Sequence, residues 1–208
     1  MSEATREARW ESRFAATEDY VFGTAPNAFL AAQAHRIAPG GRVLSVADGE
    51  GRNGVFLAGL GLDVHTVEVA PAAIAKARRL AIQRGVNVQF EQANLLHWAW
   101  PEAAYDAVVA IFVQFVTADE RPAFFAHLIR ALKPGGVLLL QGYRPEQLNY
   151  RTGGPSEASQ CYTEAMLLAA FAALRIESLH CHDAIVHEGA GHAGMSALID
   201  LVAYRPPA

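Results

Sequence analysis

From residue 42 onward, short apolar runs alternate along the chain with longer amphipathic segments. The apolar runs are rich in Val, Ile and Leu and are bounded by glycine, proline or polar residues, a pattern typical of buried strands. Strands are therefore expected at 42–47, 63–69, 87–91, 105–112, 137–143, 176–186 and 196–204. The segments between them predict helices at 52–60, 71–84, 119–132 and 163–173.

This alternation predicts an α/β fold, a Rossmann-like three-layer sandwich on a mostly parallel seven-stranded sheet. Strands joined through helices run parallel, because each crossover connection returns the chain to the end of the sheet at which the previous strand began. Only a short loop separates the last two expected strands, so an antiparallel C-terminal strand is predicted. Residues 1–41 show helical periodicity and are expected to form an N-terminal helical cap over the cofactor site. Residues 42–208 would form the core of the same single domain.

Composition narrows the class of protein. The chain has 208 residues, of which 52% are hydrophobic and 18% charged, a globular composition without a signature of disorder. The net charge of −4, with no stripe of Lys and Arg, argues against a nucleic-acid partner. No apolar run approaches the ~18 residues of a membrane span, and no secretory signal precedes the core, so no membrane partner and a cytoplasmic location are expected. We expect a monomer or a homodimer.

The most informative stretch is the turn after the first expected strand, where Gly49, Gly51 and Gly54 precede a helix. Glu68 follows about 20 residues later at the end of the second strand, where a carboxylate can accept both ribose hydroxyls. This spacing also matches the dinucleotide fingerprint, so a nicotinamide cofactor is an alternative. The acidic residues Asp48 and Glu50 within the turn suit a cationic ligand and repel a pyrophosphate. The turn therefore favours S-adenosylmethionine.

Further motifs agree with this cofactor. They are Trp10-x-x-Arg13-Phe14, the segment 20–27 (YVFGTAPN), the turn 47–53 (ADGEGRN) and the segment 132–136 (LKPGG). In these motifs the chain resembles the class I S-adenosylmethionine-dependent methyltransferases, and more narrowly the tellurite-resistance and thiopurine methyltransferases. The resemblance implies S-adenosyl-L-methionine as cofactor. It implies transfer to a small-molecule acceptor, a thiol or a nucleophile derived from a selenium or tellurium oxyanion, in detoxification.

The resemblance also implies a set of cofactor-binding residues. They are Trp10, Arg13, Tyr20, Ala47, Asp48, Gly49, Gly51, Arg52, Asn53, Glu68, Val69, Asn94, Leu95 and Ile111. The chain departs from the class pattern at Ser45, where many members carry an acid, at Ala47, which replaces a glycine, and at Asn94, which replaces an Asp. The Asn94 carbonyl can still accept from the adenine amino group. Asp48 could supply the carboxylate that Ser45 lacks.

Candidate acceptor residues follow the carboxyl ends of the later strands, where ligands of open α/β sheets bind. They are Phe112, Gln114, Tyr143, Arg144 and Tyr150, and 150–155 reads as a flexible lid or a simple surface loop. Tyr143, Arg144 and His187 are the candidate catalytic residues, with His187 as a base whose charge is tunable near pH 7. His180, His182, His187 and His192 could hold a metal, but no Cys or Glu pattern accompanies them, and no metal site is expected.

The chemistry of the reaction narrows the acceptor. Methyl transfer from a sulfonium is an in-line displacement that needs alignment and exclusion of water but no metal. A thiolate or selenide is partly ionised near neutral pH and needs little help from a base. The apolar stretch 110–115 (AIFVQF) stands where methyltransferases of nucleobase amines carry Asp/Asn-Pro-Pro-Tyr/Phe. An O- or N-methyltransferase of a small metabolite and a non-catalytic adenosylmethionine-binding protein are the alternatives.

Overall fold

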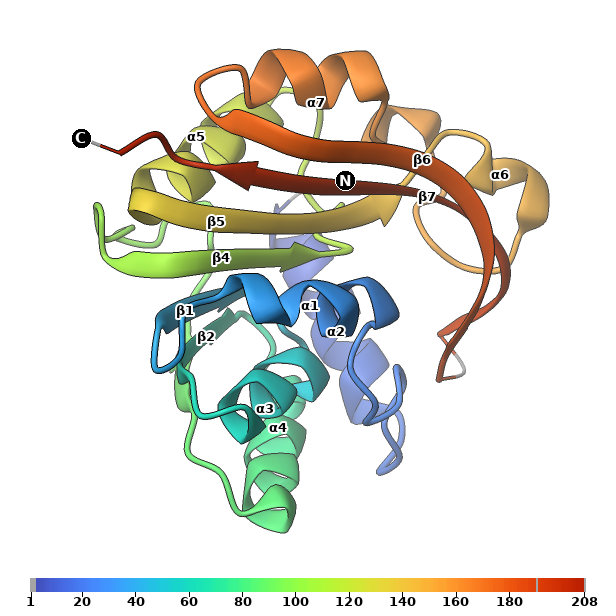
Figure 1. The fold of residues 1–208 in the computed structure, drawn as a ribbon. Helices are drawn as coiled ribbons and strands as arrows, with labels where there is room; N and C mark the ends of the chain where they lie inside the picture. Colours follow the sequence, from blue (N-terminus) through green and yellow to red (C-terminus); the bar gives the residue numbers. More distant parts are fainter. Residues whose placement is uncertain (1–2, 190, 208) are drawn as a thin grey trace.

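A computed structural model describes residues 3–189 and 191–207 and shows a single seven-stranded sheet with helices on both faces (Figure 1). The strand order is β3-β2-β1-β4-β5-β7-β6. The strands are β1 (Arg42–Val46), β2 (Asp63–Glu68), β3 (Gln89–Gln92), β4 (Tyr105–Ile111), β5 (Leu132–Tyr143), β6 (Arg175–Glu188) and β7 (His192–Tyr204). The first five pair in parallel, and β7 runs antiparallel to both β5 and β6. The predicted fold class is confirmed.

The helices form the outer layers of the sandwich. They are α1 (Glu3–Ala15), α2 (Ala28–Gln33), α3 (Arg52–Gly59), α4 (Pro71–Arg84), α5 (Arg121–Ala131), α6 (Gln147–Tyr150) and α7 (Glu164–Ala170), with short 3-10 turns at Ala34–Arg36 and Ala158–Gln160. Leu30 of α2 and Leu57 of α3 belong to the core on one face of the sheet. Phe124 of α5 and Leu167 of α7 belong to the core on the other. None of the described helices is long and apolar enough to cross a membrane.

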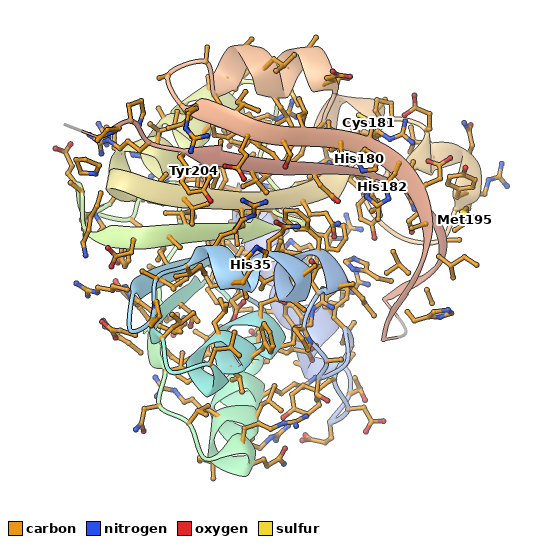
Figure 2. All side chains as sticks on the ribbon, viewed as in Figure 1. His35, His180, Cys181, His182, Met195 and Tyr204 are labelled. Carbon is orange, nitrogen blue, oxygen red and sulfur yellow. The ribbon has the colours of Figure 1, made fainter. Side chains whose placement is uncertain are left out.

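The burial of each strand follows its position in the sheet. In the central strand β4, the run Ala107–Ile111 is buried throughout, as a strand covered by helices on both faces requires. The outermost strand β6 carries only one buried residue, Val186, and alternates exposed with half-buried positions. Figure 2 shows His180 and His182 of β6 on the face of the sheet that α2 and the 3-10 turn after it cover elsewhere. The C-terminal hairpin is therefore the less covered edge of the molecule.

Some element boundaries differ from those expected. The helix expected from residue 119 begins at Arg121, and Thr117 and Glu120 cap its start reciprocally. The Thr117 hydroxyl accepts from the Glu120 amide (3.3 Å), and the Glu120 carboxylate accepts from the Thr117 amide (2.8 Å). The last two strands are longer than predicted, because backbone pairing continues from the sheet to the tip of the hairpin, as far as the pair Glu188 and His192.

Candidate active site

The turn between β1 and α3 is held in a left-handed backbone conformation. Gly49 has φ +59° and Gly51 has φ +85°, and Ala47 also lies in this region at φ +49°. A side chain at Gly51 would place its Cβ 2.6 Å from the Cβ of Ala77, so this glycine allows α3 to pack closely against α4. Gly51 does not line the cleft, since its side-chain position faces α4. In this structure its position serves the packing of α3 on α4.

The Asp48 carboxylate lies beside the Ser45 hydroxyl at the end of β1. Its Oδ1 accepts from the Ser45 hydroxyl (2.7 Å) and its Oδ2 from the Gly54 amide (3.1 Å), so it joins the end of β1 to the start of α3. Burial of this carboxyl raises its pKa to about 7, against the lowering effect of these hydrogen bonds. Its side chain also lines the cleft beside the turn.

Glu50 was expected to help attract a cationic ligand, but its carboxylate is used inside the protein. It forms a buried ion pair with Lys76 (2.8 Å) and accepts from the amides of Val21 and Phe22 (3.1 Å each). Glu50 thereby fixes the segment after α1 against α4. Of the two acids in the turn, only Asp48 faces the cleft.

Glu68 lies at the carboxyl end of β2 and joins that strand to the turn. Its Oε2 accepts from the Gly49 amide (3.0 Å), and its Oε1 accepts from the amides of Val69 (2.9 Å) and Ala70 (3.0 Å). Burial raises the pKa of Glu68, while these three amides act in the opposite direction. The Oε2 atom retains capacity for a further donor at the wall of the cleft.

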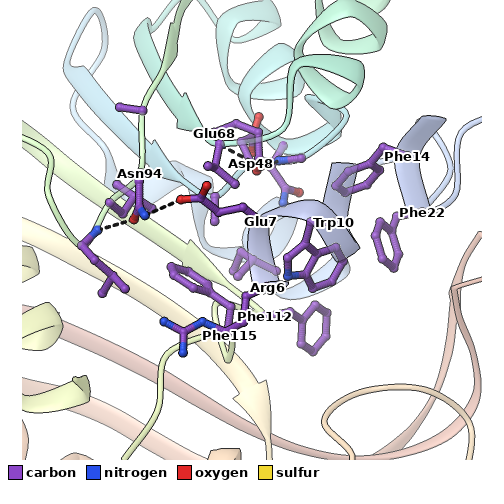
Figure 3. Close-up of a pocket in the computed structure, with 18 of the residues that line it drawn as sticks. Arg6, Glu7, Trp10, Phe14, Phe22, Asp48, Glu68, Asn94, Phe112 and Phe115 are labelled. Atoms are coloured by element: carbon purple, nitrogen blue, oxygen red, sulfur yellow. Dashed lines mark hydrogen bonds between the residues drawn. The ribbon is translucent and has the colours of Figure 1, made fainter. Parts of the chain in front are cut away.

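The cofactor cleft is the hollow at the carboxyl ends of β1, β2 and β4, with α1 lying across it (Figure 3). Among the residues predicted to bind cofactor, it is lined by Trp10, Ala47, Asp48, Gly49, Arg52, Asn53, Glu68, Val69, Asn94, Leu95 and Ile111. The rest of the wall consists of the predicted acceptor residue Phe112 and of residues that sequence reasoning missed: Glu3, Arg6, Glu7, Phe14, Phe22, Ala93, Leu96, Phe115 and His192. Only the helical periodicity of 1–41 could have pointed to the residues of α1, since it predicts a face but not which face turns inward.

Besides Gly51, two predicted cofactor residues lie outside this cleft. The Tyr20 hydroxyl donates to the Lys76 carbonyl (3.2 Å), and the ring packs beside Val55 and Leu80 between α3 and α4. Arg13 lines a neighbouring hollow instead, where its guanidinium lies over the rings of Phe22 and Trp10.

Asn94 makes contacts that differ from the predicted one. Its carbonyl accepts from the Leu96 amide (2.8 Å), and its amide nitrogen donates to Glu3 and, at 2.5 Å, to Glu7 of α1 (Figure 3). The Asn94 carbonyl is therefore already bonded within its own loop. The carboxylate of Glu7 is the acceptor that α1 brings to this end of the cleft.

A second hollow, called here the acceptor hollow, adjoins the cofactor cleft and shares a wall with it. The shared wall consists of Arg6, Trp10, Phe112, Phe115 and His192. The remaining lining residues are Arg9, Arg13, Gln114, Tyr143, Gly154, Pro155, Ser156 and Gln160. The structure thus brings the predicted acceptor residues Phe112, Gln114 and Tyr143 together, along with part of the segment predicted to be a lid.

Arg144 and Tyr150 do not reach this hollow. The Arg144 guanidinium donates to the Leu198 carbonyl (3.0 Å) and pairs with Asp183 on β6. The Tyr150 hydroxyl donates to the same Asp183 carboxylate (2.8 Å). Both side chains tie the segment after β5 to the C-terminal hairpin, which is a structural role.

His192, and not His187, lies at the site. His187 is exposed on β6 and lines neither hollow, because side chains alternate along a strand and its neighbours Val186 and Glu188 point inward. The His192 ring lies 4.7 Å from the Phe112 ring and 5.6 Å from the Tyr143 ring, centroid to centroid. Burial lowers the pKa of His192, so its imidazole is neutral near pH 7.

Three buried polar atoms around this point have no hydrogen-bond partner among the described residues: Arg52 Nη1, the Tyr143 hydroxyl and His192 Nδ1. Arg52 Nη2 is bonded to Glu188 (2.6 Å), and the same carboxylate lies 3.8 Å from His192 Nδ1. Burial raises the pKa of Tyr143, so its hydroxyl stays protonated and acts only as a neutral donor or acceptor. Buried groups without partners are costly, so these three are candidates for contact with a ligand.

A third cluster lies apart from the cleft on the C-terminal hairpin. His180, His182 and Asp200 present ligand atoms within 4.8 Å of one another. Asp200 accepts from His182 (2.9 Å) and from Gln141 (2.6 Å), and the two imidazole rings are stacked (Figure 2). Of the four histidines that the sequence places near one another, the structure brings His180 and His182 together with Asp200. His187 and His192 lie elsewhere on the hairpin.

Comparison with known proteins agrees with this geometry. Residues 43–136 match the family model described as a methyltransferase domain. The demethylmenaquinone methyltransferase of Thermus thermophilus is 36% identical over 106 residues, which are 50% of this chain and 48% of that protein. A protein-L-isoaspartate O-methyltransferase of Xanthomonas euvesicatoria is 35% identical over 119 residues, 57% of this chain and 45% of that protein. The chain spans less than half of the length of the curated relatives it matches.

Solved structures share the fold over nearly the whole chain. A protein that converts a disulfide bond into a thioacetal group during echinomycin biosynthesis has a TM-score of 0.77 at 23% identity, covering 99% of this chain and 92% of that one. TehB from Haemophilus influenzae has a TM-score of 0.73 at 18% identity, covering 94% and 67%. The strand order is that of the class I methyltransferase fold, and residues 43–136 within it match a methyltransferase domain.

Proposed function

We propose that this protein transfers the methyl group of S-adenosylmethionine to a small thiol or another soft nucleophile, such as a reduced selenium or tellurium species, which His192 keeps deprotonated. The observation that carries the proposal is the position of His192 in the wall shared by the cofactor cleft and the acceptor hollow. The fold alone does not fix the reaction, because a [4+2]-cyclase has the same fold with a TM-score of 0.67.

The residues of the cleft fit the cofactor. S-adenosylmethionine carries a carboxylate, for which the unpartnered Arg52 Nη1 is a cationic donor, and a ribose diol, for which Glu68 Oε2 is an acceptor. The apolar side chains of Val69, Leu95 and Ile111 line the same cleft and suit an adenine ring. When bound, the cofactor supplies an electrophilic methyl group on a positively charged sulfur.

His192 and Tyr143 would then prepare the nucleophile. A neutral imidazole can accept the acceptor's proton, and the nearby Glu188 carboxylate, held by Arg52, favours the imidazolium that results. The protonated Tyr143 hydroxyl can donate to the acceptor and orient it. The rings of Phe112, Phe115 and Trp10 limit water at the shared wall, so a thiolate formed there is less hydrated and more nucleophilic.

Support for a sulfur acceptor comes from three directions. The shared wall is aromatic and holds one neutral imidazole instead of a strong base such as a buried carboxylate, which suits a nucleophile that ionises easily. The fold neighbour from echinomycin biosynthesis acts on sulfur, and TehB is a fold neighbour as well. The resemblance of residues 10–27 and 47–53 to the tellurite-resistance and thiopurine enzymes points the same way.

The test measures cofactor binding and turnover separately. Titration calorimetry with S-adenosylmethionine, S-adenosylhomocysteine and NADH should show binding of the two adenosyl ligands alone. Mass spectrometry should then detect the methyl thioether formed from a thiol panel, together with methylated products from selenide and telluride. Replacement of His192 by Asn should lower kcat by about 10² to 10³ without changing cofactor affinity, as expected for loss of a general base.

His187→Asn is the matched control, because His187 is an exposed histidine on the paired strand of the same hairpin. It should leave kcat within two-fold. Binding of NADH alone would overturn the cofactor assignment. Normal cofactor binding with no turnover of any acceptor in the panel would refute the proposed acceptor class.

A further inference from the structure

The inner face of α1 carries three arginines toward the acceptor hollow. Arg6, Arg9 and Arg13 are separated by three and four residues, so they share one face of the helix. All three line the acceptor hollow. No Asp or Glu appears among the described residues that line it. This hollow therefore has a positive wall although the whole chain has a net charge of −4.

The three arginines differ in their partners. Arg6 is buried and its charge is balanced by Glu120, whose carboxylate lies 2.7 Å away. Arg9 and Arg13 form no ion pair with any described residue. Burial lowers the pKa of Arg13 and the like charge of Arg9 lowers it further, against the opposing effects of Glu50 and Tyr143, so the two guanidinium groups are near enough to repel each other.

Arg13 is also held in place by aromatic rings. Its guanidinium carbon lies 4.9 Å from the centroid of the Phe22 ring and 5.4 Å from that of Trp10. These contacts orient the side chain without neutralising it. Arg9 and Arg13 are both exposed to solvent, and a pair of cations without ion-pair partners on one side of a hollow is suited to bind an anionic group such as a carboxylate.

We infer that Arg9 and Arg13 bind an anionic group of the methyl acceptor that is distinct from its nucleophilic atom. The inference rests on the proposed function. Arg9 and Arg13 line only the acceptor hollow, whereas His192 lies in the wall that both hollows share. An acceptor that spans the distance from His192 to these arginines carries its nucleophilic atom beside His192 and its negative charge beside α1. The class of acceptor is a small thiol that bears a carboxylate.

The reaction balances without a further reagent. The acceptor sulfur forms a bond to the methyl carbon as the bond from that carbon to the sulfonium sulfur breaks. His192 takes the thiol proton, and the electron pair of the broken bond stays on the sulfur of S-adenosylhomocysteine. The carboxylate takes no part in these bonds and only positions the acceptor.

A matched pair of acceptors tests the inference: 4-mercaptobenzoate and its neutral analogue 4-mercaptobenzamide. The protein should turn over the carboxylate with a kcat/KM at least ten-fold higher than the amide. Arg9→Gln and Arg13→Gln should each reduce kcat/KM for 4-mercaptobenzoate by about ten-fold, mainly through KM, and should change the amide by less than two-fold. Arg84→Gln, an equal change of charge on an exposed arginine at the end of α4, should change neither.

A binding measurement separates this inference from the proposed function. Calorimetric titration of benzoate into the protein saturated with S-adenosylhomocysteine requires no methyl transfer. Loss of benzoate binding in both variants, with unchanged affinity for S-adenosylhomocysteine, supports the anion site even if no thiol is methylated. Equal binding of benzoate by all variants, or equal turnover of the carboxylate and the amide, overturns it.

Discussion

The two halves of the active site are built in different ways. In the cofactor half, formed by β1, β2, α3 and α4, functional carboxylates bond to amides close in sequence: Asp48 to Gly54, and Glu68 to Val69. In the acceptor half, the contacts join distant segments. Arg6 pairs with Glu120 across 114 positions. The hydrogen bonds of Asp48 and Glu68 all lie within residues 45–70, whereas the second half exists only once distant segments have come together.

The halves also differ in how far their polar groups are satisfied. The carboxylates of the cofactor turn have backbone or side-chain partners for every oxygen. Two buried atoms near the acceptor hollow, the Tyr143 hydroxyl and His192 Nδ1, have no hydrogen-bond partner among the described residues, against one in the cofactor half, Arg52 Nη1. A fully bonded turn is rigid and prepared for a fixed ligand, whereas unpartnered groups depend on a ligand to complete them. The comparison predicts that damage to the first half affects folding and cofactor binding, while damage to the second affects turnover.

The largest effect on stability is expected at Gly51. In Gly51→Ala the new Cβ would lie 2.6 Å from the Cβ of Ala77 at a φ of +85°, so both a clash and backbone strain oppose folding. The free energy of unfolding should fall by about 3 kcal/mol. Gly59→Ala, at the end of the helix that follows Gly51, has no atom within 4 Å of the new Cβ and should leave stability unchanged or raise it by ~0.5 kcal/mol. Urea unfolding of both variants checks this; equal stability would mean that the turn does not depend on close packing.

The next effect is on cofactor affinity at Glu68. Glu68→Gln keeps the shape of the side chain but removes its charge and one acceptor, so hydrogen bonds to the ribose diol are weakened. We expect S-adenosylhomocysteine to bind about 30- to 100-fold more weakly, which corresponds to ~2–3 kcal/mol. Titration calorimetry measures it. Tyr143→Phe in the acceptor half should leave that affinity within three-fold. An equal loss of affinity in both variants would show that the two halves do not differ in cofactor binding.

A smaller effect, on pH dependence, is expected from Asp48. Its folded pKa of about 7 lies above the ordinary value of 3.8, so the stability it contributes is complete below about pH 4 and is lost as the pH rises through 7. A cationic ligand favours the ionised carboxylate, so S-adenosylmethionine should bind more tightly as the pH rises from 6 to 7.5, by up to about ten-fold. Binding should release a proton.

Asp48→Asn is the control for that measurement, since it cannot ionise. The pH dependence that remains in the variant belongs to other groups, including the amino group of the cofactor. A variant with the same pH dependence as the natural protein would show that Asp48 does not titrate in this range.

Sequence reasoning succeeded where structure is local. The period of the apolar runs predicted the sheet and its antiparallel end, and the spacing from Gly49 to Glu68 predicted the end of the cofactor cleft that both residues line. It failed where a side chain's direction depends on distant contacts. His187 and His192 have similar surroundings in the sequence, and only the register of the hairpin, which pairs His187 with Ala193, decides which of them faces inward.

The smallest effect is expected at Tyr20, which lies near the cofactor half but does not line the cleft. Tyr20 belongs to a motif that predicts cofactor contact, yet its hydroxyl bonds to the Lys76 carbonyl at 3.2 Å. Tyr20→Phe should therefore lower the free energy of unfolding by ~0.5–1.5 kcal/mol, the usual contribution of one hydrogen bond, and leave cofactor affinity within two-fold. Trp10→Ala removes a ring from the cleft wall, so it should weaken cofactor binding more than it lowers the free energy of unfolding. If Tyr20→Phe weakened cofactor binding as much as Trp10→Ala, α1 and the segment after it would move on binding and bring Tyr20 into the cleft.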